Sequence, residues 1–423
     1  MSKPNLIKIK RNNLECIIEK FPSELASVTL FLPGGTFYEL PNQKNLTHLT
    51  EHLLTLTPNA GVNYVDWRYN YYFKYKIKTE AYTYKNHVSL TISSHLNTFR
   101  AALNYLFDNW LNQNINYQDF KRAKYTVLSE ELHYCDNPFN QSIDEFNKTF
   151  GGDRKLFANS IEKVESSQKI TIDLVRNYLS WTHNSNKAKA AICGNVNIQL
   201  IKDYIENVNI PKINSNYNYK KFRYQNINTD RNPSPLIIRK NNALHINYVI
   251  IGFILNQDYT PRIKLLLMIL YRAFQEIINT FTLSTGLSYV SKTGLETIPY
   301  NIWLKTYLQV NPDHTELLLK LIMKEFNKLK DNKKVFSISK DNLEKSLTKP
   351  STAYRAYELT EMIYYNHMPL SLDKALKQLN YLTFLDYRKF LDTIIRTKNL
   401  KILFYGNVRR TKSELIRNLK FLD

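Results

Sequence analysis

The sequence predicts an α+β protein built from two homologous domains. Its 423 residues exceed the roughly 100–200 residues of a typical soluble domain. Strand-like and helix-like segments follow one another in the same order in both halves, and each half ends on Gly-Asn-Val, at residues 194–196 and 406–408. A repeated order of elements indicates duplication. We therefore expect domains at residues 1–209 and 236–423, joined by a polar linker over residues 210–235.

Each element is predicted from the spacing of its apolar residues, which alternate in strands and recur every three or four positions in helices. In the first half, Pro58 ends one helix and Asp-Asn-Pro at residues 136–138 ends another. The predicted strands there are residues 6–10, 16–20, 28–32, 83–93 and 188–192, and the helices are residues 46–56, 98–111, 117–135 and 172–180. In the second half the predicted strands are residues 237–239, 246–255 and 400–405, with a hairpin over 286–307, and the helices are residues 262–278, 316–330, 352–365 and 384–397.

Composition narrows the class of protein. Hydrophobic residues make up 43% of the chain, enough to bury a core, which argues against disorder. Three cysteines are too few for a disulfide framework. The sequence begins without a basic-then-apolar leader, and no apolar run approaches the ~18 residues of a membrane span. We therefore expect a cytoplasmic protein with no membrane span.

The formal net charge is +21, from 58 basic and 37 acidic residues. Such a balance suits a nucleic-acid partner, but the basic residues are scattered without a dense run. An abundance of Lys, Asn, Ile and Tyr is also what an AT-rich coding sequence gives. We expect no nucleic-acid partner, and a basic nucleic-acid-binding protein that carries the motif below by chance stays as an alternative.

The segment His-Leu-Thr-Glu-His at residues 48–52 carries the most chemistry. On a helix, His48, Glu51 and His52 fall within an arc of about 100°. Two imidazoles one turn apart can share a metal ion, and zinc suits nitrogen ligands with an open position for water. H-x-x-E-H is the inverzincin signature. The alternative is a polar helix face with two solvated histidines.

A third ligand is expected from Glu130 or Glu131, on the helix predicted over residues 117–135. Adjacent residues on a helix point about 100° apart, so only one of the two can face the metal. The alternative for either is a solvated surface glutamate.

Together these residues resemble the M16 peptidase family, the pitrilysin, insulinase and mitochondrial processing peptidase group. Four further segments in the right order are similar to that family's motifs. They are Gly-Thr-Phe-Tyr-Glu at residues 35–39, Glu-Ala-Tyr-Thr at 80–83, residues 127–138 and Gly-Asn-Val at 194–196. The resemblance implies mostly antiparallel sheets packed with helices, in a half-length chain that forms half of a clamshell.

The resemblance also implies roles for single residues. His48, His52 and Glu131 would bind one Zn²⁺ per chain, and Glu51 would be the general base. A peptide substrate would add a strand along the edge that contains Ala81, Tyr82 and Thr83. Tyr289 would reach the substrate of a partner subunit, and its alternative is a core aromatic.

Three positions depart from the family pattern. Lys124 stands where a supporting glutamate is usual, Glu80 replaces an asparagine of the edge strand, and Thr282 replaces an arginine of the second domain. A chain with zinc ligands but without that arginine resembles the catalytic half of a heterodimer with a homologous subunit, with a homodimer as the other arrangement.

The expected function is hydrolysis of short or unfolded peptides by a zinc metallopeptidase. Half-length chains of this group resemble proteins that process leader peptides of secreted peptides such as bacteriocins. The alternative is a non-catalytic partner subunit of the same fold. Metal content separates the two, because one zinc per chain favours the enzyme.

Overall fold

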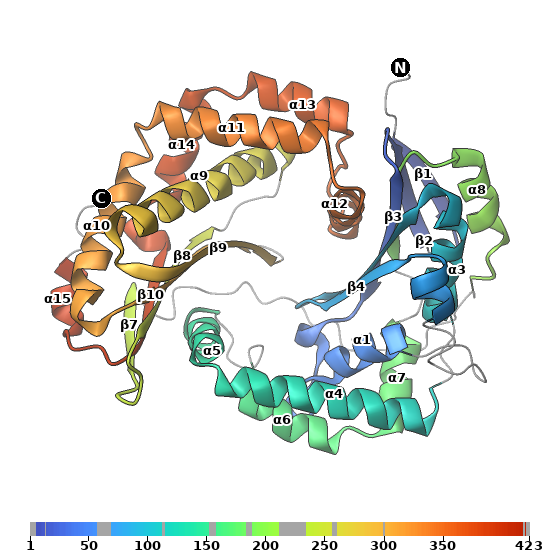
Figure 1. Cartoon of the computed structure of the whole chain (residues 1–423), viewed down its shortest axis with the longest axis horizontal. Coiled ribbons are helices and arrows are strands. Elements are labelled where there is room, and N and C mark those ends of the chain that lie inside the picture. The colour runs from blue at the N-terminus through green and yellow to red at the C-terminus, as the bar shows by residue number, and fades with distance from the viewer. Residues whose placement is uncertain are drawn as a thin grey trace. The chain divides into compact units, whose positions relative to one another are not determined.

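The first sheet has six strands in the order β1-β2-β6-β3-β5-β4. Strands β1, β2, β3 and β4 are labelled in Figure 1. Strands β2 and β6 pair in parallel, and the other neighbours pair antiparallel. The bounds are β1 Leu6–Arg11, β2 Leu14–Lys20, β3 Leu25–Pro33, β4 Lys78–Thr83, β5 His87–His95 and β6 Lys189–Gly194. The computed structural model describes residues 6–12, 14–56, 69–111, 115–151, 158–182, 188–210, 234–255, 260–298, 301–417 and 419.

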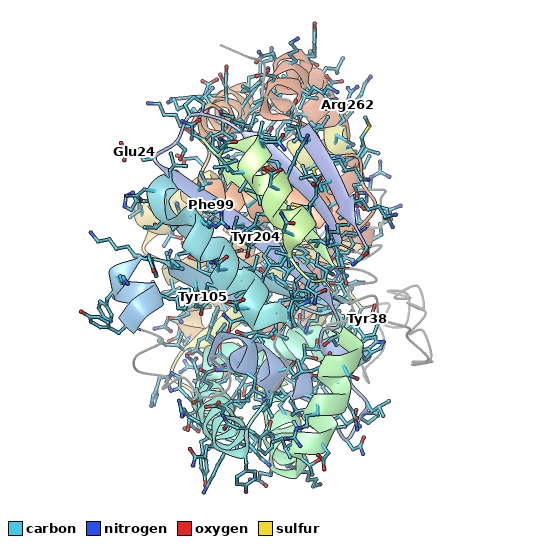
Figure 2. The ribbon with its side chains drawn as sticks, turned by 90° about the vertical axis from the view of Figure 1, so that its right-hand side faces the viewer. Glu24, Tyr38, Phe99, Tyr105, Tyr204 and Arg262 are labelled. Atoms are coloured by element: carbon cyan, nitrogen blue, oxygen red, sulfur yellow. The ribbon has the colours of Figure 1, made fainter. Side chains whose placement is uncertain are left out.

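One face of this sheet is apolar and is covered by α3 (Phe99–Leu111) and α8 (Ile198–Asn207), which lie side by side in Figure 2. Leu30 and Leu90 face each other across β3 and β5 and are at most 1% exposed. The Phe107 and Tyr204 rings join the two helices, with centroids 5.6 Å apart. Alternation along the strands thus places one row of side chains in a packed core.

The other face is polar and is covered by α12 (Thr352–Tyr364), a helix from the second half of the sequence. The Ser27 and Thr352 hydroxyls lie 2.8 Å apart, and Thr360 donates to the Thr29 carbonyl at 3.3 Å. Arg355 is 2% exposed and pairs with the buried Glu19 of β2. The helix is therefore attached by polar contacts rather than by an apolar stripe alone.

The second sheet has five strands in the order β7-β11-β8-β10-β9, again with one parallel pair, β7 with β11. Its order repeats that of β2-β6-β3-β5-β4. The helix α5 (Pro138–Phe150), from the first half of the sequence, packs on β8 and β11. Gly252 makes room for it, since an added Cβ would lie 2.7 Å from the Phe146 ring. The strands are β7 Leu236–Lys240, β8 Asn247–Leu255, β9 Ser288–Ile298, β10 Asn301–Val310 and β11 Leu400–Gly406.

The remaining helices complete two compact units, one around each sheet. The first unit comprises residues 1–133, 161–223 and 349–374, and the second comprises residues 134–160, 224–348 and 375–423. The helices are α1 Leu46–Leu56, α4 Tyr117–Asp136, α6 Ser160–Lys169, α7 Ile172–Thr182, α9 Pro261–Thr285, α10 Thr315–Lys328, α11 Lys333–Thr348, α13 Leu372–Tyr381, α14 Phe384–Ile394 and α15 Lys412–Arg417, with a short π-helix η2 at Tyr69–Lys74.

The expected α+β class with two homologous, mostly antiparallel sheets is confirmed. Each unit nevertheless takes one helix from the other half of the sequence, α12 in the first and α5 in the second. Residues 211–233 of the predicted linker lie outside the described residues. The proposed boundaries at 209 and 236 therefore stay a prediction. Across the described ranges no helix is both long and apolar enough to cross a membrane.

One strand differs from expectation. The run predicted over residues 83–93 is the end of one strand and most of another, because the chain turns at Tyr84, whose amide donates to the His87 carbonyl at 2.9 Å. The result is the antiparallel pair β4 and β5, with β4 as the last strand of the sheet. The helices α5, α6, α11 and α13 were not predicted.

Candidate metal centre

Helix α1 carries the motif at residues 48–52. Leu46, Leu49 and Leu53 are at most 1% exposed and anchor one side of the helix in the core. His48 and His52 lie one turn apart on the other side, and their side chains are only partly buried. The 3.6-residue period of the helix therefore places the leucines on a buried face and the two histidines on the other face.

The start of α1 is fixed by a buried carboxylate. Glu39 is 3% exposed and accepts hydrogen bonds from the backbone amides of Asn45 at 3.1 Å and Thr47 at 2.8 Å. Burial raises the pKa of Glu39, and these hydrogen bonds oppose the shift. An acceptor at a helix N-terminus satisfies amides that have no partner within the helix. Glu39 thus sets where the helix begins and so where His48 points.

Helix α4 brings a carboxylate to both histidines. Oε2 of Glu130 lies 3.3 Å from Nε2 of His48 and 3.3 Å from Nε2 of His52, and the two Nε2 atoms lie 3.2 Å apart. In a tetrahedral zinc site with bonds of 2.0–2.1 Å, neighbouring ligand atoms are about 3.3 Å apart. Among the described residues these three form the group that can hold a metal ion, and their spacing fits zinc.

Glu131 lies beside the same histidine but on its other nitrogen. Its Oε1 is 3.7 Å from Nδ1 of His48 and 3.4 Å from Nζ of Lys163, and the residue is 6% exposed. Its Oε2 is buried and has no hydrogen-bond partner among the described residues. The structure thus brings both adjacent glutamates to the histidines, with Glu130 on the Nε2 side. Which of them binds metal stays a prediction.

The ionisable groups of this cluster shift one another's pKa values. Burial lowers the pKa of His48, but hydrogen bonds and charges from Glu130, Glu131 and Glu51 outweigh it and raise the pKa to about 9. Burial and the neighbouring His48 lower the pKa of His52. Two nitrogen atoms 3.2 Å apart cannot both present lone pairs to each other without a proton or a cation between them. Either a proton on one of the two rings or a cation between them therefore satisfies this contact.

Glu51 lies close to His48 and to Thr83 of β4. It is 8% exposed, and its Oε2 lies 3.9 Å from Nε2 of His48 and accepts a long hydrogen bond of 3.5 Å from Thr83. Burial is the largest cause that raises its pKa to about 7. A carboxyl group that titrates near neutral pH can both accept and donate a proton.

The edge strand β4 lies against α1. Thr83 faces α1, whereas Tyr82 points to the opposite face and is 52% exposed. Glu80, at the departure from the family pattern, pairs with Lys78 at 2.6 Å. Because β4 is the last strand of the sheet, no strand within the described part of the chain pairs with its outer edge. An extended chain could pair there.

The residue expected to reach a partner's substrate, Tyr289, and the residue that replaces the family arginine, Thr282, belong to the second unit. Tyr289, on β9, is 92% exposed, so the alternative of a core aromatic is wrong. The Thr282 hydroxyl donates to the Ile278 carbonyl within α9 at 2.7 Å. Thr282 thus offers neither the charge nor the reach of an arginine.

The departure at Lys124 has a structural role. Its Nζ donates to the carbonyls of Gln168 and Ile170, both at 2.8 Å, and so attaches the end of α6 to α4. The same helix carries Lys163, next to Glu131, and Ser167, next to Asn45. None of these α6 contacts was predicted, because the segment shows few apolar residues. In the sequence, the one residue that could have indicated these contacts is Asn45, three positions before His48.

Comparison with known proteins gives a family match over part of the chain. Residues 169–349 match the family model described as the Peptidase M16 inactive domain. That segment does not include α1 or α4. No curated protein matches the sequence.

Solved structures share the fold at low identity. A protease from Helicobacter pylori has a TM-score of 0.78 and 14% identity, covering 95% of this chain and 100% of that one. A peptidase M16 inactive domain from Pseudomonas fluorescens has a TM-score of 0.77 and 14% identity over 96% of this chain and 100% of that one. The periplasmic protease PqqL from Escherichia coli has a TM-score of 0.70 and 13% identity, covering 99% of this chain but 50% of PqqL. At these identities the likeness shows the fold.

Proposed function

From the premise that this chain is an M16-like protein, by its family match over residues 169–349 and by its fold, we propose that it is a zinc metallopeptidase that hydrolyses short or unfolded peptides. The observation that carries the proposal is the triangle of His48 Nε2, His52 Nε2 and Glu130 Oε2, with sides of 3.2–3.3 Å. It stands beside a buried carboxyl group, Glu51, whose pKa lies near neutral pH.

His48, His52 and one glutamate of α4 would hold the metal. Glu130 is favoured by its distances, and Glu131 by the resemblance of its segment to the family motif. Bound zinc would supply Lewis-acid polarisation of the scissile carbonyl and would make a water molecule more acidic. The orphaned Oε2 of Glu131 supports a cation near this cluster, because a buried carboxylate oxygen without a partner is costly.

Glu51 would move the proton. It would accept a proton from the attacking water and then donate it to the nitrogen of the leaving amine. Its pKa of about 7 suits both steps, because the group is neither strongly acidic nor strongly basic at neutral pH. Thr83 would help to keep the carboxylate in place through its hydroxyl.

The substrate would bind as an extended strand beside β4, at Ala81, Tyr82 and Thr83. Main-chain pairing tolerates many sequences, so peptides as a class are the expected substrates. Since Thr83 contacts Glu51, a peptide on this edge would pass close to the catalytic group. Leader-peptide processing of a secreted peptide such as a bacteriocin is the finer proposal.

We also propose that the active form pairs this chain with a homologous subunit. Thr282 lacks the charge of the family arginine, so the partner would supply that contact, while the exposed Tyr289 is available to bind substrate. The chain spans half the length of PqqL, as expected of one half of a larger enzyme. A monodisperse, fully active homodimer would argue against the heterodimer.

A non-catalytic subunit is the second candidate function. It is favoured by the description of the matched family model as an inactive domain. The matched segment begins after α4, so that description does not bear on His48, His52 or Glu130. A chain that binds no zinc would support this candidate.

The Glu51→Gln variant tests the enzyme proposal. It should bind zinc like the wild type and lose peptidase activity by about 10²–10⁴-fold, the usual contribution of a general acid–base group. Glu276→Gln, an exposed glutamate of α9, is the matched control and should keep full activity. Turnover of the Glu51 variant at the wild-type rate would overturn the assignment.

A further inference from the structure

Asn45, just before α1, has an uncommon backbone conformation. Its φ is 74°, in the left-handed region, where asparagine is tolerated better than most side chains but glycine is the default. The residue is 3% exposed. Its amide donates to Glu39, and its carbonyl accepts from the Leu49 amide at 3.1 Å. The backbone of Asn45 is therefore held by hydrogen bonds on both sides.

That side chain connects α6 to the first motif histidine. Nδ2 of Asn45 lies 3.0 Å from Oγ of Ser167, and Oδ1 lies 3.3 Å from Nδ1 of His48. The Ser167 hydroxyl donates to the Lys163 carbonyl at 2.8 Å. Because its proton is used there, the Ser167 oxygen must accept from Asn45. This assigns Nδ2 to Ser167 and leaves Oδ1, an acceptor, facing His48.

An acceptor at Nδ1 decides which nitrogen of His48 carries the proton. In the neutral ring one nitrogen donates and the other has the free lone pair. Without a metal, Nε2 also faces an acceptor, Oε2 of Glu130 at 3.3 Å. Once a cation occupies the Nε2 side, Oδ1 of Asn45, together with Oε1 of Glu131 at 3.7 Å, keeps the proton on Nδ1. The lone pair then lies on Nε2, toward His52 and Glu130.

We propose that Asn45 is a positioning residue for metal binding: fixed by Ser167 of α6, it sets the tautomer and orientation in which His48 offers Nε2 to the metal. The inference rests on the proposed zinc site and adds a supporting contact from α6, the helix that Lys124 attaches to α4. Asn45 and α6 would thus support His48 in a chain that has Lys124 where the family usually has a supporting glutamate.

The test compares zinc affinity in Asn45→Gly and the wild type by competition with a chelator. Glycine suits φ 74° and keeps both backbone hydrogen bonds, so the metal-free variant should unfold close to the wild-type temperature. Its zinc affinity should fall 10–100-fold, as for other partners of metal-binding histidines. Asn366→Gly, at another residue with positive φ (58°), is the matched control and should change neither property.

Two further variants and one spectrum separate positioning from folding. Ser167→Ala leaves the Asn45 backbone alone and should weaken zinc binding by a smaller factor. Asn45→Asp keeps an oxygen acceptor and should retain more affinity than the glycine variant. In the zinc-loaded protein, the Nδ1 proton of His48 should exchange with water faster in Asn45→Gly than in the wild type, as seen by NMR.

The outcomes distinguish the two proposals. A wild-type chain that binds no zinc overturns the proposed function and this inference with it. A wild type that binds zinc, with Asn45→Gly equal to it in affinity and in Nδ1 exchange, overturns the role of Asn45 alone. Loss of affinity that appears only together with lowered stability of the metal-free variant, and is absent in Ser167→Ala, also overturns it.

Discussion

The two sheets follow one plan, but among the described residues only the first unit carries a group of side chains that could hold a metal ion. In each unit a helix joins the third strand of the shared order to the edge strand, α1 between β3 and β4 and α9 between β8 and β9. Helix α1 presents two histidines and a glutamate, whereas α9 has no histidine within Pro261–Thr285 and buries apolar residues instead. A duplicated fold therefore does not duplicate a site, which depends on side chains that one copy has and the other lacks.

The shared plan extends to the backbone at the ends of β6 and β11. Gly194 and Gly406 have φ of 134° and 138°, and a Cβ at either would lie within 3 Å of the neighbouring strand. Both close approaches require glycine. The matching Gly-Asn-Val segments thus reflect the same turn in both copies.

The largest expected difference between the units is in how much stability depends on the polar contacts of the helix that each takes from the other half of the sequence, α12 in the first unit and α5 in the second. Arg355→Ala would remove the buried cation that pairs with the carboxylates of Glu19 and Glu358, so we expect a loss of about 3–5 kcal/mol in unfolding free energy. In the second unit, Lys305 of β10 donates to Asn147 of α5 at 3.0 Å and pairs with Glu296 of β9. Lys305→Ala should cost less, about 1–3 kcal/mol, because the Glu296 side chain is 39% exposed. Chemical denaturation measures both.

The exposed pair of Arg262 and Asp386 is the control for these variants, since its arginine side chain is 62% exposed. Arg262→Ala should cost less than about 1 kcal/mol. Equal losses at Arg355 and Arg262 would show that the buried network contributes nothing special to the first unit.

The two adjacent glutamates of α4 should differ in their effect on zinc. If Glu130 is the ligand, Glu130→Gln should weaken zinc binding more than 100-fold, whereas Glu131→Gln should weaken it 10–100-fold, as for a residue that supports a ligand. Calorimetric titration of both variants measures the difference. The reverse order would assign the metal to Glu131, as the family motif implies.

Zinc affinity should depend on pH in a direction set by His48. Its pKa of about 9 in the metal-free protein lies above its ordinary value of 6.5, so below pH 9 the ring must lose a proton before it binds metal. Affinity should rise by about tenfold per pH unit toward pH 9 and then level off. A constant affinity between pH 6 and 9 would contradict the raised pKa that the neighbouring glutamates give His48.

Much of the fold could be predicted from the sequence because apolar spacing was regular. Helix α1 has the predicted bounds, 46–56, since its leucines repeat at helical spacing and Pro58 follows. Helix α5 was missed because Asp-Asn-Pro at 136–138 was interpreted only as a stop. Asn137 in fact caps the next helix by accepting from the Phe139 amide, with Pro138 at its first position.

The candidate site was predictable only in part. His48, Glu51 and His52 follow from spacing on one helix, which needs no knowledge of packing. The choice between Glu130 and Glu131 depends on how α4 is rotated about its own axis, which the spacing does not give. The contribution of α6 was hidden for a similar reason, because Ser167 acts through a contact with Asn45, 122 positions away in the chain.

The most direct test is the zinc content of the purified chain beside that of His48→Ala/His52→Ala, measured by elemental analysis after dialysis against metal-free buffer. The account predicts one zinc ion per wild-type chain and none in the double variant, with both chains folded. Wild-type protein without zinc, or a double variant that retains it, would contradict the claim that these two histidines of α1 bind the metal.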